Sequence, residues 1–310
     1  MKNSNRSSSL KRRKIRGGLA TSLMALPAMV SLIAFSYLPM FGLIMAFQDF
    51  SYVRGIFGSS FVGLKNFAYI FKSGEIVRTI GNTIGYHFGT TILVTSFGLM
   101  LALLLYFVKS RRAANFFQKT IVMPYMVSYV VIAYIVYILL KNQGGLVNTI
   151  IEMVGGKNIS WYTEPKYWPA ILLMVQVWFG AGIKSIYYYA SLMGIDESLF
   201  EAADLDGATR WNKICNIMLP SITPVISMFL ITDLGNLLES SFSLFYSVPM
   251  NSSALYKATD VLSTYTYRGL VTGNIGTTTA LGLFTGTVSA LGTLAVNGVV
   301  RKISPENALF

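Results

Sequence analysis

Six long stretches of this sequence carry almost no formal charge, and this feature limits the possible fold more than any other. Four of them contain no Asp, Glu, Lys or Arg: 17–48, 79–108, 120–140 and 269–300. A fifth stretch, 167–195, contains only Lys184, and the sixth, 214–256, contains only Asp233 and Glu239. A helix that crosses the hydrocarbon core of a membrane needs about 20 predominantly apolar residues, so each stretch is long enough to span a bilayer.

The charge-free stretches predict an all-α polytopic membrane protein, because backbone groups in lipid must satisfy their own hydrogen bonds and helices do so. The six transmembrane helices are expected near 20–47, 82–108, 120–140, 167–193, 220–246 and 275–300. Residues 1–19 form a basic tail, and residues 20–305 form one six-helix domain. Small residues spaced by four predict closely packed helices, and they include Gly81, Gly85, Gly89, Gly282 and Gly286.

The composition excludes several classes of protein. Charged residues make up 12% of the chain, whereas soluble domains carry about 25%. A net charge of +12 on a soluble protein would favour nucleic acid, but these charges are too few to cover a soluble core, so we expect membrane lipid as the contact. One cysteine excludes an internal disulfide, and one histidine excludes a multi-histidine metal site. We therefore expect no catalytic and no metal-binding residues.

The distribution of Lys and Arg predicts how the chain is oriented, because these residues accumulate in cytoplasmic loops. With the N-terminus inside, the inner segments hold 16 of the 25 Lys and Arg residues and the outer segments hold nine. We therefore expect both termini on the cytoplasmic side of a bacterial plasma membrane. The first apolar run is about twice the length of the apolar region of a signal peptide, so we expect a retained helix.

The inner segment at 196–220 has a pattern unlike that of an ordinary connection between spans. It reads E-A-A at 201–203, then Gly207 after three residues, and I-x-L-P at 217–220 after nine more. Asp196 is a candidate N-cap, and Gly207 can adopt a positive φ that ends a helix. Pro220 suits the first turn of the next span. The pattern predicts a rigid helix–turn–helix that projects from the membrane.

This pattern resembles the cytoplasmic EAA loop of permease subunits in binding-protein-dependent ABC importers. In that family the short helix docks in a groove on the ATPase subunit and transmits its movement. The resemblance implies a type I ABC importer permease fold, with Glu201 in an ion pair with an ATPase arginine and Gly207 supplying the hinge geometry. The ATPase-coupling residues that it implies are Glu201, Ala202, Ala203, Asp206, Gly207, Ile217, Leu219 and Pro220.

Two weaker motifs narrow the resemblance to the maltose-type sugar permeases. Residues 61–67, F-V-G-L-K-N-F, are similar to an F-x-G-L-x-N-[YF] stretch of sugar-type members, and residues 258–268 look like the branch that handles oligosaccharides and polysaccharides. The resemblance implies a second homologous permease, two ATPase subunits and an extracytoplasmic solute-binding protein. No P-loop G-x-x-x-x-G-K-[ST] occurs here, so ATP and Mg²⁺ belong to the ATPase, and this chain is a transport subunit rather than an enzyme.

The fifth predicted span contains the candidate substrate pathway. Charged groups inside a membrane are costly and usually face a cavity or a partner. At 100° per residue, Phe229, Asp233, Asn236 and Ser240 fall on one side of a helix, and Glu239 borders it. A polar stripe beside aromatic rings suits a neutral sugar, whose hydroxyl groups need directed partners. The candidate pathway residues are Asp233, Asn236, Glu239, Ser240 and Phe179.

Several alternatives remain open from the sequence. Asp233 and Glu239 could instead pair with Lys184 or with the partner permease and serve assembly. The solute could be something other than a sugar, since permeases for other solutes share the EAA loop. A stand-alone secondary transporter or channel would need inverted repeats, and an intramembrane enzyme would need clustered nucleophiles or metal ligands; neither pattern is visible here.

Overall fold

The structure is a computed structural model that describes residues 23–303, so the basic tail at 1–19 lies outside the described residues. Within 23–303, five helices are long and apolar enough to cross a membrane: Leu23–Phe47, Gly74–Tyr106, Pro165–Leu192, Arg210–Gly235 and Ile275–Lys302. A sixth span exists if the bent pair Arg111–Met126 and Tyr129–Leu140 is counted as one. The prediction of an all-α polytopic membrane protein is confirmed.

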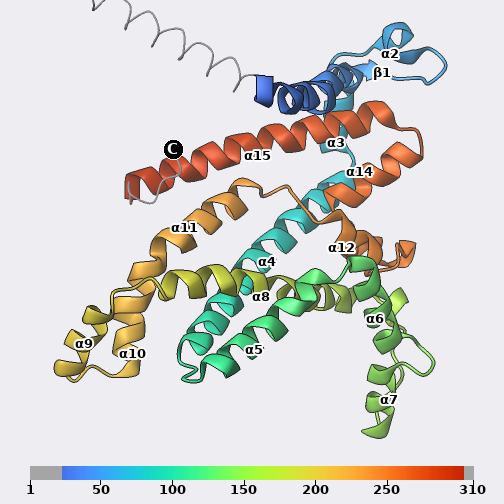
Figure 1. Cartoon of the computed structure of the whole chain (residues 1–310). Coiled ribbons are helices and arrows are strands. Elements are labelled where there is room, and N and C mark those ends of the chain that lie inside the picture. Colours follow the sequence, from blue (N-terminus) through green and yellow to red (C-terminus); the bar gives the residue numbers. More distant parts are fainter. Residues whose placement is uncertain (1–22, 304–310) are drawn as a thin grey trace, which may run out of the picture.

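The chain order of the elements is simple, and the long helices make up most of it (Figure 1). The main helices after Leu23–Phe47 are α3 (Lys65–Lys72), α4 (Gly74–Tyr106), α5 (Arg111–Val122), α6 (Tyr129–Leu140), α7 (Leu146–Met153), α8 (Trp168–Leu192), α9 (Glu197–Leu205), α10 (Arg210–Lys213), α11 (Leu219–Gly235), α12 (Phe242–Ser247), α14 (Leu262–Val271) and α15 (Ile275–Ile303). Two further short helices are α2 (Gly55–Gly58) and α13 (Tyr256–Thr259). Strands β1 (Gln48–Asp49) and β2 (Ser60–Phe61) pair antiparallel, with Gln48 opposite Phe61.

Helices α4 and α8 form the centre of the structure. The Ser73 hydroxyl caps α4 by accepting from the backbone N–H of Ile76, and Glu75 lies in its first turn, where it complements the helix dipole. The two helices approach closely at Gly98 of α4, where an added Cβ would lie 3.2 Å from Cβ of Lys184 in α8. Figure 1 shows α9 and α10 at the lower left of this pair, and α12 and α14 to its right.

The third predicted span, 120–140, is not one continuous helix. Pro124 lies in a short 3-10 helix, Met123–Met126, that follows α5, and the chain turns by 95° between this segment and α6. Proline lacks a backbone N–H and its ring clashes with the preceding turn, so it breaks the regular hydrogen-bond ladder. The hydroxyl of Ser128 then starts α6 by accepting from the N–H of Val131.

The fifth predicted span, 220–246, is likewise not one continuous helix. Helix α11 ends at Gly235, and Asn236 leaves the helical conformation while its N–H still reaches the carbonyl oxygen of Asp233 at 3.2 Å. Residues 236–241 form a turn before α12. Helical spacing therefore cannot be extended from Asp233 to Ser240, and the predicted polar stripe is interrupted by a break in the helix.

Most of the glycines predicted to bring helices together have no close neighbour in this chain. A Cβ at Gly81, Gly85, Gly282 or Gly286 would meet no atom within 4 Å, and only Gly89 of the predicted set faces a tight neighbour, Leu173. The closest approach is at Gly182 in α8, where a Cβ would lie 2.0 Å from the carbonyl oxygen of Ile121 in α5. Position along a helix does not reveal which face a neighbour will cover.

Gly182→Ala should therefore destabilise the folded protein by about 1–3 kcal/mol, because the added methyl group collides with backbone that cannot rotate away. Gly85→Ala is the matched control, since a Cβ there is in open space. Thermal unfolding of the purified protein in detergent checks this. Equal melting temperatures for the two variants would contradict the packing of α8 against α5.

Candidate functional site

The segment predicted to couple to an ATPase folds as two short helices. The carboxylate of Asp196 caps α9 by accepting from the N–H of Ser198 at 3.0 Å, and this hydrogen bond holds the pKa of Asp196 below its usual value. Helix α9 ends at Leu205, and Gly207, directly after the C-cap residue, has a φ of +72°. The N–H of Gly207 reaches the carbonyl oxygen of Asp204, and that of Ala208 reaches Ala203, which is the double hydrogen bond of a Schellman cap.

The second half of this segment ties the two helices together and connects them to the membrane. The hydroxyl of Thr209 caps α10 by accepting from Asn212, and Nζ of Lys213 lies 2.5 Å from Oδ1 of Asp204 in α9. The chain then continues through a π-helical turn, Ile214–Met218, into α11, with Pro220 in the first turn of that helix. Helices α9 and α10 therefore connect directly to α11 without a flexible loop.

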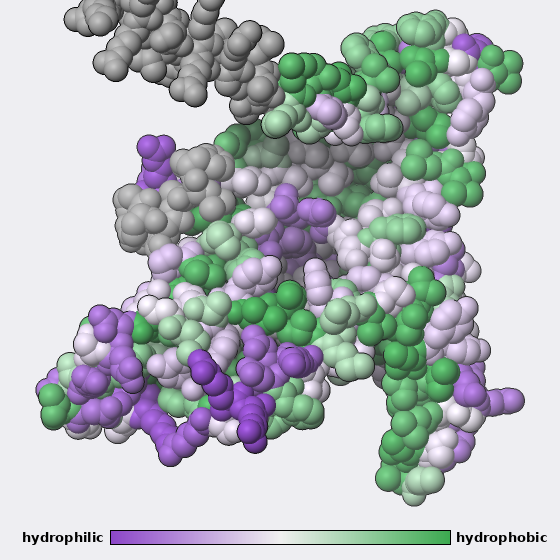
Figure 2. Space-filling model, in the orientation of Figure 1, coloured by the Kyte–Doolittle hydropathy of each residue, from purple (hydrophilic) through white to green (hydrophobic). Residues whose placement is uncertain are grey.

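The tip of this segment is exposed, and Figure 2 shows hydrophilic side chains gathered over it at the lower left. Glu201, Ala202 and Asp206 are exposed, and the carboxylate of Glu201 has no ion-pair partner among the described residues. Two large apolar side chains are exposed as well, Leu205 at 90% and Trp211 at 69%. Neither residue is in the predicted coupling set, although an exposed apolar residue beside the E-A-A motif indicates a contact surface.

The other end of the segment is anchored in the protein. Met218 is fully buried beside Ala102 of α4 and Tyr188 of α8, and Ile217 and Leu219 are partly buried around it. A contact at the tip therefore reaches the centre of the bundle through packed side chains. The eight predicted coupling residues divide into a tip, Glu201–Gly207, that is exposed except for the half-buried Ala203, and a base in which Ile217 and Leu219 are partly buried and Pro220 is exposed.

A charged pair lies inside the bundle between α8 and α11. Nζ of Lys184 lies 2.6 Å from Oδ2 of Asp233 and donates to Oγ1 of Thr95 at 2.9 Å. The ammonium group also lies 5.2 Å from the centre of the Phe229 ring. Lys184 is only 8% exposed, so burial is balanced by the ion pair, the hydroxyl group and the ring. The pairing with Lys184 that the sequence left open is the one the structure contains.

A cavity of about 220 Å³ opens beside this pair. Helix α4 lines it with His87 and Thr90, α8 with Gln176, and the turn after α11 with Glu239 and Ser240. A second cavity adjoins it, lined by Asp233, Asn236 and Glu239 among others. Four of the five predicted pathway residues therefore meet here: Asp233, Asn236, Glu239 and Ser240. Hydrophilic side chains are visible in the hollow below α15 in Figure 2.

The fifth predicted residue, Phe179, lies elsewhere. Its ring packs 4.3 Å from the ring centre of Tyr129 and 5.1 Å from that of Tyr125, near the break between α5 and α6. It is not among the described residues that line the two cavities. Within 23–303, no group of three His, Cys, Asp or Glu residues is placed to hold a metal ion.

One side of α4 carries a row of polar residues that sequence reasoning missed. Asn82 donates to the carbonyl oxygens of Lys257 and Asp260, and the hydroxyl of Tyr86 donates to that of Ala258. Thr83 accepts from the N–H of Leu262, and the His87 ring contacts the carbonyl oxygens of Asp233 and Glu239. The row at 82, 83, 86 and 87 thus satisfies backbone groups of the irregular segment between α11 and α14.

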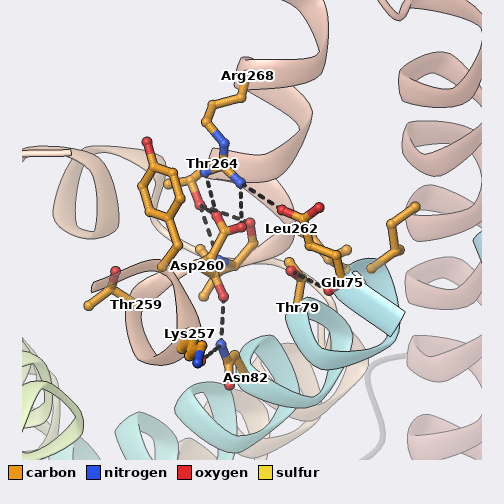
Figure 3. A network of polar contacts seen from close by, with 12 residues as sticks. Glu75, Thr79, Asn82, Lys257, Thr259, Asp260, Leu262, Thr264 and Arg268 are labelled. Carbon is orange, nitrogen blue, oxygen red and sulfur yellow. Dashed lines mark hydrogen bonds and ion pairs between the residues drawn. The ribbon is translucent and has the colours of Figure 1, made fainter. Parts of the chain in front are cut away.

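A buried ion pair organises the same segment (Figure 3). Asp260 is 1% exposed and accepts from both terminal nitrogens of Arg268 and from the hydroxyl of Thr264. The guanidinium also lies 4.0 Å from the centre of the Tyr256 ring. The two hydrogen bonds between Asp260 and Arg268 join the chain just before α14 to the last turn of that helix. Asn82 joins Asp260 to α4. The conformation of the motif at 258–268 is therefore held by this buried ion pair.

Comparison with known proteins agrees with this geometry. Residues 95–307 match the family described as binding-protein-dependent transport system inner membrane component. The chain is 32% identical over 285 residues to the polygalacturonan/rhamnogalacturonan transport system permease protein YteP of Bacillus subtilis (strain 168), covering 92% of this chain and 88% of that protein.

Solved structures also match. A chain in the crystal structure of a bacterial ABC transporter involved in the import of the acidic polysaccharide alginate has a TM-score of 0.86 at 30% identity, covering 94% of this chain and 98% of that one. A chain of the bacterial alginate transporter in complex with an alginate pentasaccharide-bound periplasmic protein has a TM-score of 0.85 at 31% identity, covering 94% and 97%.

The ion pair between Lys184 and Asp233 gives a testable energetic prediction. Asp233→Asn leaves a buried ammonium without its counter-charge and should destabilise the protein by about 3 kcal/mol, the low end for buried pairs because the Asp233 side chain is 30% exposed. Lys184→Met in the same chain removes the orphaned charge, so the double variant should be more stable than Asp233→Asn alone. Thermal unfolding of Asp233→Asn, Lys184→Met and the double variant checks this. A double variant whose loss of stability equals the sum of the two single losses would contradict the pairing.

Proposed function

The chain belongs to the binding-protein-dependent transport system inner membrane component family, and we propose that it forms half of the translocation pathway of an ATP-driven saccharide importer. The observation that carries the proposal is the direct connection between two sites. The exposed helices α9 and α10 lead into α11, and α11 carries Asp233 in the wall of the central cavity. A movement at one end reaches the other through helical structure.

The coupling role of α9 and α10 follows from their rigidity and exposure. The Schellman cap at Gly207 and the pair between Lys213 and Asp204 hold the two helices in one arrangement. Exposed Glu201, Leu205 and Trp211 offer one charge and two apolar anchors to another protein. We propose that an ATPase subunit binds this surface, with one of its arginines on Glu201. That ATPase subunit holds the ATP and Mg²⁺.

The orientation in the membrane follows from the same assignment. Helices α9 and α10 lie on the cytoplasmic side if they bind an ATPase, and the six-span arrangement then places both termini on that side as well. The segment between α11 and α15 faces outward, where an extracytoplasmic solute-binding protein delivers the solute. A second homologous permease completes the pathway, and two ATPase subunits drive it.

The chemistry of the cavity favours a neutral saccharide. Lys184 is already neutralised by Asp233, and the exposed carboxylate of Glu239 repels anionic groups. Carboxylate, amide and hydroxyl oxygens in the cavity accept hydrogen bonds from sugar hydroxyl groups. Some relatives have names that refer to acidic polysaccharides. The charges in the cavity of this chain favour a neutral saccharide instead.

Gly207→Val should uncouple ATP hydrolysis from uptake, because a β-branched residue at φ +72° is strained by about 1–3 kcal/mol and opens the turn between α9 and α10. Gly155→Val is the matched control: Gly155 also has a positive φ, +81°, but lies after α7, away from α9. Uptake per ATP hydrolysed, measured in proteoliposomes, should fall only in Gly207→Val. Wild-type uptake by that variant would overturn the coupling role.

Affinity purification tests the assembly. A tag on this chain should bring down a homologous permease and an ATPase from detergent-solubilised membranes, and Glu201→Lys should release the ATPase while keeping the permease. Lys119→Glu, on the amphipathic helix α5, is a control charge reversal outside α9 and α10. Purification of this chain as a functional transporter without an ATPase would favour a stand-alone secondary transporter and contradict the proposal.

A further inference from the structure

We propose that the groove between the turn after α11, helix α14 and helix α15 is a second saccharide subsite, which holds a sugar unit against Phe242 and Tyr267. This inference rests on the proposed function and adds to it, because a second subsite implies a solute of at least two sugar units.

The groove has the size and lining of a ligand site. Its volume is about 410 Å³, within the range of roughly 300–1,000 Å³ that is typical of ligand pockets. Phe242 and Tyr267 provide aromatic surface, and Tyr267 is 41% exposed. Five hydroxyl-bearing residues line the groove, namely Ser240, Ser263, Thr266, Tyr267 and Thr285.

The aromatic wall is held in place by ring contacts. The ring centres of Phe242 and Tyr267 are 5.0 Å apart, and Tyr246 packs behind both, at 4.9 Å from Phe242 and 5.3 Å from Tyr267. The negative face of an aromatic ring attracts the weakly positive C–H groups on the face of a sugar ring. A sugar unit can therefore stack on this wall without first ordering it.

The hydroxyl groups lie at one edge of a groove whose lining is otherwise apolar and includes Leu238, Leu262 and Leu270. Oγ of Ser240 and Oγ of Ser263 lie 3.0 Å apart, so the two groups bond each other and can exchange that bond for one to a sugar hydroxyl. The combination of an apolar wall and a polar edge matches a sugar ring.

The groove continues from the central cavity. Glu239 and Ser240 line both spaces, and the cavity beside Asp233 also includes these two residues. A chain of sugar units can therefore extend from the charged cavity into the groove while Glu239 and Ser240 contact the linkage between them. This continuity assigns the groove to the same solute rather than to an unrelated ligand.

The buried ion pair in Figure 3 explains how the wall keeps its position. Asp260 and Arg268 hold α14, which carries Ser263, Thr266 and Tyr267, and Asn82 ties Asp260 to α4. A site that is rigid before binding loses less entropy when the ligand arrives. The 258–268 motif thus supports a binding wall, although Asp260 and Arg268 are positioning residues that the saccharide does not touch.

Cysteine labelling of the assembled transporter tests which molecule occupies the groove. Cys215 is the one cysteine in the chain, so Cys215→Ser gives a clean background for Thr266→Cys, with Tyr134→Cys on exposed α6 as the control position. The probes are size-fractionated hydrolysates of starch, cellulose and pectin, and separately a short-chain phospholipid. We expect a fraction that the transporter imports to slow maleimide labelling at 266 at least threefold and to leave labelling at 134 unchanged. Protection by phospholipid alone would overturn the proposal.

Chain-length dependence of uptake gives a second readout. Tyr267→Ala should lower uptake of tri- and tetrasaccharides about threefold to tenfold, the range expected for one aromatic contact, and Tyr267→Phe should keep it. Uptake of a sugar that fills only the central cavity should change little in both variants. Equal loss for all lengths would show a structural role and overturn the subsite. If the wild-type transporter imports none of the saccharides, the proposed function itself is wrong.

Discussion

Two of the predicted spans break within residues 23–303, and the rest of the structure depends on how the freed backbone groups are satisfied. Lipid offers no hydrogen bonds, so each break must find its partners within the protein. Helix α4 supplies them for the segment after α11, through side chains from Asn82 to His87. Because α4 is continuous over 33 residues and packed on α8, it holds irregular chain at a depth where regular helix is the rule.

The same break creates the functional chemistry. If α11 continued past Gly235, Glu239 and Ser240 would lie on a helix surface and no turn would reach toward α4. The break instead places a carboxylate and hydroxyl groups around the pair of Lys184 and Asp233. At its other end α11 begins directly after α9 and α10. One helix therefore connects the exposed coupling surface to the polar cavity, which suits a subunit that turns the movement of a partner into access for a solute.

Much of this could be predicted from the sequence, and the failures have physical reasons. Charge-free stretches mark spans because the cost of burying charge is large and local, and the caps at Asp196 and Gly207 follow from the properties of single residues. The end of α11 at Gly235 could not be predicted, since the carbonyl oxygen of Asp233 in its last turn contacts His87, 146 residues away in the chain. The packing of Gly182 and the position of Phe179 likewise depend on which helix covers which face. The ion pair joins Asp260 to Arg268, only eight residues apart, yet the contact that holds Asp260 on α4 comes from Asn82, 178 residues away.

Uptake by purified components tests directly whether this chain forms half of a saccharide pathway. The complex that contains this chain is reconstituted into liposomes with its solute-binding protein outside and ATP inside, and a labelled neutral oligosaccharide is added. If this chain forms half of the translocation pathway, the oligosaccharide should accumulate above its external concentration only when ATP, the binding protein and this chain are all present. Accumulation that persists without ATP or the ATPase, or a complete and ATP-hydrolysing complex that moves no saccharide, would contradict it.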